Sequence, residues 1–395
     1  MRDLLILRGA PGCGKSTFIT SHHLEPYTLS SDALRLLYRS PILDLNGKLT
    51  ISQSVNSNVW NTLFEMLETR LGRGDFTVID ATFSKTEELQ RVKNLALKYR
   101  YRLHLVDFTD VSIDECRRRN RMREELRVVP DEVIDCMAER FATEKIPSGF
   151  NVIRPHEIES VNMQKINLSQ YEKIIHIGDI HGCYTVLGTY LEDLNSNYCY
   201  IFTGDFLDRG SENAQVLRFL LEIYAKPNVL LIEGNHERHL VAYCRGDKSR
   251  SREFESRTRP QLDAAGLNKH EIRKLCRKLR ECVWYQYHDK EIFVSHGGIS
   301  SLANNSAFIP SEQIIKGVGT YEDYLKVAQS WDQHTDKNCY QIFGHRNTER
   351  SPMCLSGRCF CLEGKVEHGG SLRALELDNT GFKEVEIRNK ATEAF

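Results

Sequence analysis

The chain has 395 residues, and its 53 lysines and arginines are balanced by 54 aspartates and glutamates to give a formal net charge of -1. This length exceeds what one hydrophobic core usually organises, so two domains are expected. The balanced charge gives no global sign of affinity for nucleic acid, so any such affinity must be local. Hydrophobic residues make up 41% of the chain and no apolar run is long enough to span a membrane, so no membrane partner is expected.

The beginning of the chain and its cysteines predict the cellular compartment. An apolar run follows Met1-Arg2-Asp3 directly, which leaves no room for a signal peptide. The 12 cysteines are then expected to be reduced thiols, because disulfides are rare in the cytoplasm. We therefore expect a cytoplasmic protein.

The first motif is formed by residues 9–16, which fit the pattern G-x-x-x-x-G-K-[ST] and follow a predicted buried strand at 4–7. In this pattern glycines turn backbone N–H groups toward an anion, Lys15 reaches the β- and γ-phosphates as a catalytic group, and the Ser16 hydroxyl ligates magnesium. The pattern predicts binding of ATP, or another nucleoside triphosphate, with Mg²⁺; the alternative is a glycine-rich turn without a ligand. The predicted nucleotide-binding residues are Gly9, Gly12, Gly14, Lys15, Ser16 and Thr17.

Two carboxylates follow at the ends of predicted strands. Asp32 comes after a short strand at 28–30, where it could accept the proton of an attacking hydroxyl, and Arg35 one helical turn later could hold an anionic acceptor. A second strand, from Phe76 onward, ends in Asp80, which could position the acceptor. As isolated residues, Asp32 would be a helix cap and Asp80 a turn residue.

An arginine-rich segment comes after the predicted helices at 54–73 and 86–99 and the strand at 101–107. It contains six arginines within residues 114–127. Such a charge run usually forms a solvated helix face. In a small P-loop kinase, however, a lid closes over the nucleotide at this place, and one or two lid arginines stabilise charge on the transferring phosphoryl group.

Several segments of the first half together resemble the kinase module of the polynucleotide 5′-kinases. They are the P-loop at 9–16, S-D-x-x-R at 31–35, V-I-D-A-T at 78–82, and R-N-x-x-R at 119–123 leading to V-P-D-E-V at 129–133. The resemblance implies that Asp32 is the general base for a 5′-hydroxyl, that Arg35 contacts the phosphate of the end nucleotide, and that Arg123 is the lid arginine at the γ-phosphate. Asp80 and Arg119 are further substrate-binding candidates on the same ground.

The predicted boundary between the domains contains Pro147 and Pro155 and only short polar runs. We assign residues 1–150 to a P-loop kinase domain and residues 151–171 to a linker. Residues 172–395 are then expected to form the second domain.

Five predicted strands of the second half end in polar residues that can bind metal ions. The strands lie at 173–178, 198–203, 228–232, 291–294 and 340–343, and their ends read D-I-H-G, G-D-F-L-D-R-G, G-N-H-E, H-G-G and G-H-R. Strand ends in open α/β sheets converge on one crevice, so a single site is expected. One histidine after a strand is more often structural, but five such ends with neighbouring glycines argue against coincidence. Carboxylate, imidazole and amide ligands suit Mn²⁺, Fe²⁺ or Zn²⁺ better than Ca²⁺, and two ions about 3.5–4 Å apart could activate water for attack on phosphorus.

These strand-end motifs resemble those of the calcineurin-type metallophosphoesterases, over about residues 172–377. The resemblance implies two mixed β-sheets packed together and flanked by helices, with two bound metal ions that we expect to be Mn²⁺. It places Asp179 and His181 on the first ion, Asp205 between the ions, and Asn235, His296 and His345 on the second. It also implies that His236 is the general acid toward the leaving oxygen, that Asp208 orients it, and that Arg209 clamps the phosphate.

Two further stretches have no assigned role. Residues 245–280 are rich in arginine and lysine, which fits either a solvated insert or a phosphate-tracking surface, and no aromatic stripe indicates base stacking. Residues 360–375 resemble the last strands of the phosphatase modules found beside such kinases. There the family usually has Asp-Thr-Gly in place of Glu363-Gly364, so the role of Glu363 is open.

The sequence predicts an α/β chain in which a P-loop kinase domain, with a parallel sheet flanked by helices, precedes a metallophosphoesterase domain. The two resemblances together imply an enzyme that heals nucleic-acid ends, with RNA favoured over DNA. It would phosphorylate 5′-hydroxyl ends and remove 3′-phosphate, 2′-phosphate or 2′,3′-cyclic phosphate ends for a separately encoded ligase. The alternative is a nucleotide kinase fused to a protein serine/threonine or dinucleoside-polyphosphate phosphatase. Whether the chain forms a homo-oligomer is open.

Overall fold

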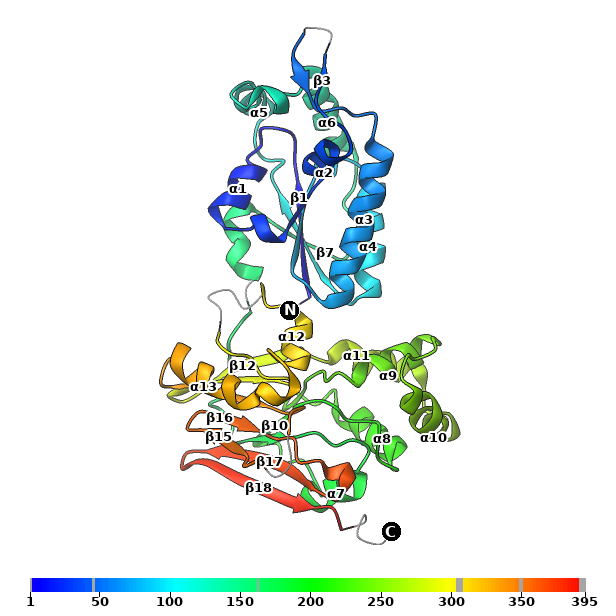
Figure 1. Cartoon of the computed structure of the whole chain (residues 1–395), viewed down its shortest axis with the longest axis vertical. Helices are drawn as coiled ribbons and strands as arrows, with labels where there is room; N and C mark the ends of the chain where they lie inside the picture. The colour runs from blue at the N-terminus through cyan, green and yellow to red at the C-terminus, as the bar shows by residue number, and fades with distance from the viewer. Residues whose placement is uncertain (1, 45–46, 162, 303–307, 348–350, 391–395) are drawn as a thin grey trace. The chain divides into compact units, whose positions relative to one another are not determined.

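The computed structural model describes residues 2–44, 47–161, 163–302, 308–347 and 351–390 (Figure 1). The chain divides into two compact units: unit 1 contains Met1–Asn162 and Asn305–Pro310, and unit 2 contains Met163–Asn304 and Ser311–Phe395. Phe308 belongs to unit 1 because its ring lies 4.6 Å from the rings of Tyr27 and Phe76. Among the described residues, no helix is both long and apolar enough to cross a membrane.

Unit 1 is built on a five-stranded parallel sheet with the strand order β2-β5-β1-β6-β7. The strands are β1 (Asp3–Arg8), β2 (Thr28–Ser30), β5 (Thr77–Asp80), β6 (Arg102–Asp107) and β7 (Phe150–Ile153). All six residues of β1 are buried, as expected for a central parallel strand that is covered on both faces.

Helices cover both faces of this sheet. They are α1 (Lys15–Ser21), α2 (Ser31–Tyr38), α3 (Asn56–Arg73), α4 (Thr86–Lys98), α5 (Ile113–Arg121) and α6 (Asp131–Thr143). Successive strand residues point to opposite faces, so Leu4 and Ile6 pack in one cluster with residues of α3 and α4. Leu5 and Leu7 pack in another cluster with Phe18 of α1. The predicted parallel sheet flanked by helices is confirmed.

Short elements complete unit 1. They are η1 (Glu25–Tyr27), the paired strands β3 (Ile42–Leu43) and β4 (Leu49–Thr50), η2 (Glu125–Arg127) and η3 (Pro155–Val161). The stretch 151–171, which the sequence predicts as a linker, contains most of β7, all of η3 and the short strand β8 (Ile166–Asn167). Ile153 and Val161 are buried in the core of unit 1, so β7 and η3 are part of that unit.

Unit 2 contains two mixed sheets that pack face to face. Their strand orders are β11-β10-β9-β17-β18 and β15-β16-β14-β13-β12-β8. The strands are β9 (Lys173–Ile177), β10 (Tyr198–Phe202), β11 (Val229–Leu231), β12 (Cys282–Tyr287), β13 (Lys290–Ser295), β14 (Cys339–Phe343), β15 (Cys354–Ser356), β16 (Cys359–Cys361), β17 (Ser371–Asp378) and β18 (Gly381–Arg388). Ile174 and Ile201 of the first sheet share a buried cluster with Tyr285 and Val294 of the second, and this cluster holds the sheets together.

Helices flank the two sheets of unit 2. They are α7 (Tyr184–Tyr190), α8 (Asn213–Ile223), α9 (Glu237–Arg245), the π-helix η4 (Phe254–Thr258), α10 (Arg259–Ala264), α11 (Lys269–Lys278), η6 (Tyr321–Asp323), α12 (Ser311–Lys316), α13 (Tyr324–His334) and η7 (Val366–His368). Val216 and Leu220, four positions apart on α8, bury against Ile175 and Phe202 of the first sheet. The predicted architecture of two packed mixed sheets with flanking helices is confirmed.

Candidate functional site

In unit 2, strand ends bring the predicted ligands together. Strand β10 runs parallel to β9 and β11, and β13 runs parallel to β14, so the polar residues that follow these strands gather at one edge. Several non-glycine residues at this edge have a positive φ angle. They are His181, Asp205, Asp208, Arg209 and His345. Such backbone costs about 1–3 kcal/mol per residue and is concentrated at functional sites.

The Asp205 carboxylate lies at the centre of the histidines. Its Oδ2 atom is 3.2 Å from His296 Nε2, 3.7 Å from His181 Nε2 and 3.9 Å from His236 Nε2. Its Oδ1 atom accepts the backbone N–H of His236 at 3.0 Å. The family resemblance predicts a bridging role for Asp205, and this carboxylate belongs to two of the groups that could hold a metal ion.

Backbone carbonyls set the orientation of two of these imidazoles. His181 Nδ1 lies 3.2 Å from the carbonyl oxygen of Leu207, and His296 Nδ1 lies 2.8 Å from that of Thr203. A carbonyl oxygen can only accept, so each Nδ1 carries a proton, and Nε2 is the ring nitrogen that could bind a metal ion. Both Nε2 atoms point toward Asp205, on the side where a metal ion would be bound.

Three groups of side chains have ligand atoms within 4.8 Å of one another. The groups are His181 with Asp205 and His236; Asp205 with His296 and His345; and Asp179 with His181 and Glu363. Asn235 Oδ1 lies 3.2 Å from His296 Nε2, so this amide faces the second group. The six predicted metal ligands therefore lie together, and Glu363 joins them.

The chemistry of these donors fits divalent metal ions. Burial raises the pKa of Asp179 well above its usual value, and the neighbouring Glu363 charge raises it further. Crowded buried carboxylates are costly unless a cation compensates them. Burial also lowers the pKa of His181, and it lowers that of His345 to about 3, so both imidazoles are in the neutral form that binds metals. Carboxylate and imidazole ligands of this kind suit Mn²⁺, Fe²⁺ or Zn²⁺.

The sequence motifs assign no role to Glu363 and Glu237, which are both buried at this site. Glu363 follows β16 and is 2% exposed, so it reaches the metal-ligand group in the same way as the other strand-end residues. Glu237 accepts the backbone N–H groups of Gly234, Asp205 and Phe206 at 2.6–3.0 Å, and thereby ties the β10 and β11 loops together. The strand-end rule that found the other ligands also identifies Glu363 once β16 is recognised as a strand.

His236 is held beside the metal-ligand group by a hydrogen-bond chain. Its Nδ1 atom lies 2.7 Å from Asp208 Oδ2, and Asp208 Oδ1 accepts the hydroxyl of Thr258. The backbone N–H of Asp208 donates to Asn213 Oδ1 at 2.8 Å. Burial alone would lower the pKa of His236, but the hydrogen bond to Asp208 and the charge of Asp205 outweigh it and raise this pKa. The ring is thus fixed with Nδ1 protonated and Nε2 toward Asp205.

Arg209 lies between His181, which the resemblance predicts to be a metal ligand, and His236, which it predicts to be the general acid. Its Nη1 atom lies 3.1 Å from His181 Nε2, and its Nη2 atom lies 3.3 Å from His236 Nε2. Nη1 also donates to Glu367 Oε1 at 2.8 Å, and the Glu367 side chain is fully buried. Glu367 was not found from the sequence, because it lies 158 positions from Arg209 in a short turn without a motif.

In unit 1, the predicted nucleotide-binding loop lies between β1 and α1. Gly14 caps α1 in the left-handed conformation. Gly12 has φ +83°, and a Cβ at this position would lie 2.2 Å from the backbone oxygen of Cys116 in α5, so only glycine fits there. Lys15 Nζ donates to the carbonyl oxygens of Gly9 at 2.6 Å and Ala10 at 3.0 Å. Ser16 and Thr17, in the first turn of α1, are exposed.

The predicted acceptor residues lie next to this loop. Burial raises the pKa of Asp80, and the charges that act on this carboxylate include those of Lys15, Asp32 and Arg123. Asp32 Oδ1 pairs with Arg35 Nη1 at 2.6 Å. The structure thus brings two carboxylates, the loop lysine and two arginines into one charged site.

The arginines of the predicted lid divide into two kinds. Burial lowers the pKa of Arg123. Among the neighbouring charges, that of Asp32 has the largest effect on this pKa, and it acts in the opposite direction. Arg119 Nη1 lies 3.8 Å from the position that a Cβ on Gly14 would take, and its Nε pairs with Glu115 at 2.6 Å. The other arginines pair with carboxylates near the surface, in the pairs Arg117–Asp114, Arg117–Asp135, Arg118–Glu115, Arg121–Asp131 and Arg127–Glu124. These pairs therefore engage the remaining arginines at the surface of the segment.

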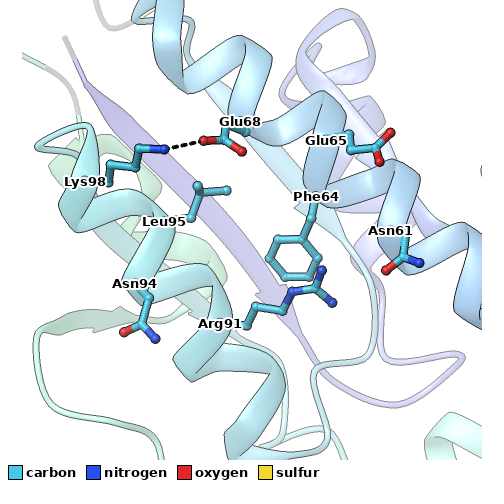
Figure 2. Close-up of a pocket in the computed structure, with 8 residues that line it drawn as sticks. All are labelled: Asn61, Phe64, Glu65, Glu68, Arg91, Asn94, Leu95 and Lys98. Carbon is cyan, nitrogen blue, oxygen red and sulfur yellow. Dashed lines mark hydrogen bonds and ion pairs between the residues drawn. The ribbon is translucent and has the colours of Figure 1, made fainter.

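A separate groove of about 420 Å³ lies between α3 and α4 of unit 1 (Figure 2). The Arg91 guanidinium stacks 3.8 Å from the centre of the Phe64 ring, and Lys98 pairs with Glu68 at 2.6 Å. None of the residues that line this groove is a predicted site residue.

Comparison with protein families agrees with this geometry. Residues 172–366 match the model of the calcineurin-like phosphoesterases, and residues 4–143 match an AAA domain model. The chain joins a kinase-like P-loop domain to a calcineurin-like metallophosphoesterase domain. The metallophosphoesterase domain supports assignment of the chain as a hydrolase that uses divalent metal ions.

Several curated relatives of the chain are phosphatases. The chain is 25% identical, over 44% of its length and 77% of the relative's, to the asymmetrical bis(5'-nucleosyl)-tetraphosphatase PrpE of Bacillus velezensis. It is 34% identical, over 31% of its length and 42% of the relative's, to the symmetrical bis(5'-nucleosyl)-tetraphosphatase of Buchnera aphidicola. It is 41% identical to serine/threonine-protein phosphatase 2 of Salmonella typhimurium, over 20% of this chain and 36% of that protein.

Proposed function

We propose that the chain is a nucleic-acid end-healing enzyme, with RNA as the favoured substrate. Unit 1 would phosphorylate 5′-hydroxyl ends with ATP and Mg²⁺, and unit 2 would remove 3′-phosphate, 2′-phosphate or 2′,3′-cyclic phosphate ends. The observation that carries this proposal is the position of Asp80, which lies beside Leu7 at the end of β1 that leads into the nucleotide loop. The charges of Asp32, Lys15 and Arg123 act in the same place. A carboxylate at this place serves transfer to a hydroxyl acceptor.

In the proposed kinase reaction, each charged residue of unit 1 has one task. The loop N–H groups and Lys15 hold the nucleotide phosphates, and Arg123 stabilises the charge on the transferring phosphoryl group. Asp32 accepts the proton of the 5′-hydroxyl. A phosphate of the acceptor strand competes for Arg35, which releases the Asp32 oxygen that Arg35 now holds at 2.6 Å.

In the proposed phosphatase reaction, the side chains around the metal-ligand group bind the phosphate and move the proton. Two divalent ions, proposed to be Mn²⁺, would supply Lewis-acid activation when bound. Arg209 holds the phosphate oxygens and is itself oriented by Glu367. His236 gives the Nε2 proton to the leaving oxygen, while Asp208 keeps the ring in place through Nδ1.

This pair of activities would convert a broken strand into ends that a ligase can join. Sealing needs a 5′-phosphate and a 3′-hydroxyl, whereas the broken strand carries a 5′-hydroxyl and a 3′-phosphate. Unit 1 would convert the 5′ end, and unit 2 would convert the 3′ end. The ligase itself would be a separately encoded partner.

The second candidate is a nucleotide kinase fused to a dinucleoside-polyphosphate or protein serine/threonine phosphatase. The names of the curated relatives favour it. The same histidine, arginine and metal ligands could serve these substrates, so unit 2 alone does not separate the two candidates.

One experiment on the full chain separates them. The protein is incubated with ATP, Mg²⁺ and 5′-hydroxyl oligonucleotides of RNA and DNA, and 5′-phosphate formation is measured. A parallel Mn²⁺ assay compares oligonucleotides that end in 3′-phosphate, 2′-phosphate or 2′,3′-cyclic phosphate with diadenosine tetraphosphate and a phosphoserine peptide. Absence of 5′-phosphate on every oligonucleotide would refute the proposed kinase.

A further inference from the structure

A strongly basic segment, residues 248–258, connects α9 to α10 in unit 2 (Figure 1). Its exposed cationic side chains are Lys248, Arg250, Arg252 and Arg257. Among the ion pairs of the described residues, none involves these four side chains. The segment also contains Glu253 and Glu255, so these four cations exceed its carboxylates by two. Glu255 accepts the Ser249 N–H at 2.6 Å and pairs with Arg259 at 3.0 Å. The segment therefore presents excess positive charge to solvent.

Both ends of the basic segment are anchored beside the proton donor of the phosphatase site. At one end, Ser249 Oγ lies 2.7 Å from His239 Nδ1, and the His239 ring centre is 6.1 Å from that of His236. At the other end, the Thr258 hydroxyl donates to Asp208, the partner of His236. Ser249 and Thr258 are buried, so these anchors hold the arginines between them close to the site.

The position of the basic segment relates it to one part of the substrate. His236 serves the leaving oxygen, and the leaving group carries the remainder of the substrate. A cationic surface beside His236 therefore lies where that remainder would extend. A small phosphate ester ends before it could use this surface, whereas a polymer with a phosphate at each step could follow it.

The side chains of the segment favour backbone contacts over base stacking. Phe254 is 1% exposed, and its ring packs 5.8 Å from His239 and 6.2 Å from Tyr243. It is the one aromatic residue between Lys248 and Thr258, and it is turned into the core. Exposed arginines and lysine without an exposed ring bind phosphates and read no bases.

We propose that Lys248, Arg250, Arg252 and Arg257 bind the phosphodiester backbone of a single-stranded nucleic acid whose phosphorylated end occupies the unit 2 site. This inference rests on the proposed function and assigns the residues that distinguish a strand from a small phosphate ester. It also gives a role to part of the arginine-rich stretch 245–280. Because the contacts are electrostatic, turnover of the strand must depend on salt.

The test uses the full chain with Mn²⁺ and measures kcat/KM for removal of the 3′-phosphate from a single-stranded oligonucleotide over a series of salt concentrations. The double variant Arg250→Ala/Arg252→Ala should flatten the slope of log(kcat/KM) against log[salt] by about 1.4, since each phosphate contact on a single strand contributes about 0.7. The ratio of kcat/KM for the oligonucleotide to that for p-nitrophenyl phosphate should fall at the same time.

The matched control is Lys226→Ala/Lys337→Ala, which removes the same charge. Both lysines are exposed and lie just before β11 and β14, at the strand ends opposite to the site. The control should retain the salt slope and the substrate ratio of the wild type.

The outcomes separate this inference from the proposed function. One outcome is that the wild type removes 3′-phosphates while the Arg250→Ala/Arg252→Ala variant has the same salt slope and the same substrate ratio as the control variant. In that case the inference is wrong and the proposed function stands. Wild-type protein that acts on diadenosine tetraphosphate or a phosphoserine peptide but on no oligonucleotide would overturn both.

Discussion

At the scale of single residues, Asp208 uses both carboxylate oxygens to hold the site together. One oxygen binds His236 and the other accepts the Thr258 hydroxyl, fifty positions along the chain. Thr258→Val keeps the shape of the side chain but removes the donor from a buried carboxylate, which costs about 1–3 kcal/mol. We expect kcat to fall about tenfold for alkyl phosphates, whose leaving oxygen needs a proton.

The dependence on the leaving group is the measurement that separates positioning from general damage. For p-nitrophenyl phosphate, which leaves readily without a proton, the loss in Thr258→Val should be much smaller. Thr258→Ser retains the hydroxyl and should recover most of the activity on alkyl phosphates. Equal losses in the serine and valine variants would show that the hydrogen bond is not the cause.

Asp32 allows the two proposed activities to be tested against each other. Asp32→Asn keeps the size of the side chain but cannot accept the substrate proton, so kinase activity should fall by about 10²–10⁴. Removal of 3′-phosphate by the same preparation should stay within twofold of the wild type. The reciprocal result is expected for His236→Ala, and loss of both activities in either variant would contradict separate sites.

At the scale of elements, the nucleotide loop depends on close packing between Gly12 and α5. A methyl group on Gly12 would collide with the Cys116 carbonyl oxygen at 2.2 Å and would push α5, with the predicted lid arginines, away from the loop. Gly12→Ala should therefore weaken ATP binding at least tenfold, as measured by calorimetry. Gly72→Ala in α3 is the matched control, because its Cβ would meet only the Tyr99 ring at 3.7 Å, and it should bind ATP normally.

The elements also show what the sequence could and could not predict. The apolar runs of β1, β9 and β10 predicted the parallel strands, and the motifs after them predicted which polar side chains would lie together at the strand ends. The contacts of Thr258 and Glu367 could not be predicted in this way, because each residue lies in a segment without a motif and meets its partner only after folding. Strand β7 was not predicted for another reason. A four-residue edge strand between prolines has no distinctive sequence pattern.

At the scale of the whole molecule, each unit should respond to its own ligand. Mn²⁺ would compensate the buried carboxylates Asp179, Asp205 and Glu363 and should raise the unfolding temperature of unit 2. A ligand at 100 times its Kd stabilises the folded state by about 2.7 kcal/mol. Calorimetry with Mn²⁺ and with ATP-Mg²⁺ should shift different transitions, and Glu363→Gln should reduce the Mn²⁺ shift. A single transition that responds equally to both ligands would contradict this expectation.

The ion pair between Arg35 and Asp32 bears on how much ATP the proposed kinase would hydrolyse when no acceptor strand is bound. A kinase that leaves its general base free can activate water and hydrolyse ATP when no strand is broken. In the proposed kinase reaction Asp32 is this base, and Arg35 pairs with it at 2.6 Å. A phosphate of the acceptor strand would draw the guanidinium away. Arg35→Ala should therefore raise the rate of ATP hydrolysis relative to the rate of 5′-phosphorylation. An unchanged ratio of the two rates would show that the ion pair does not limit ATP hydrolysis.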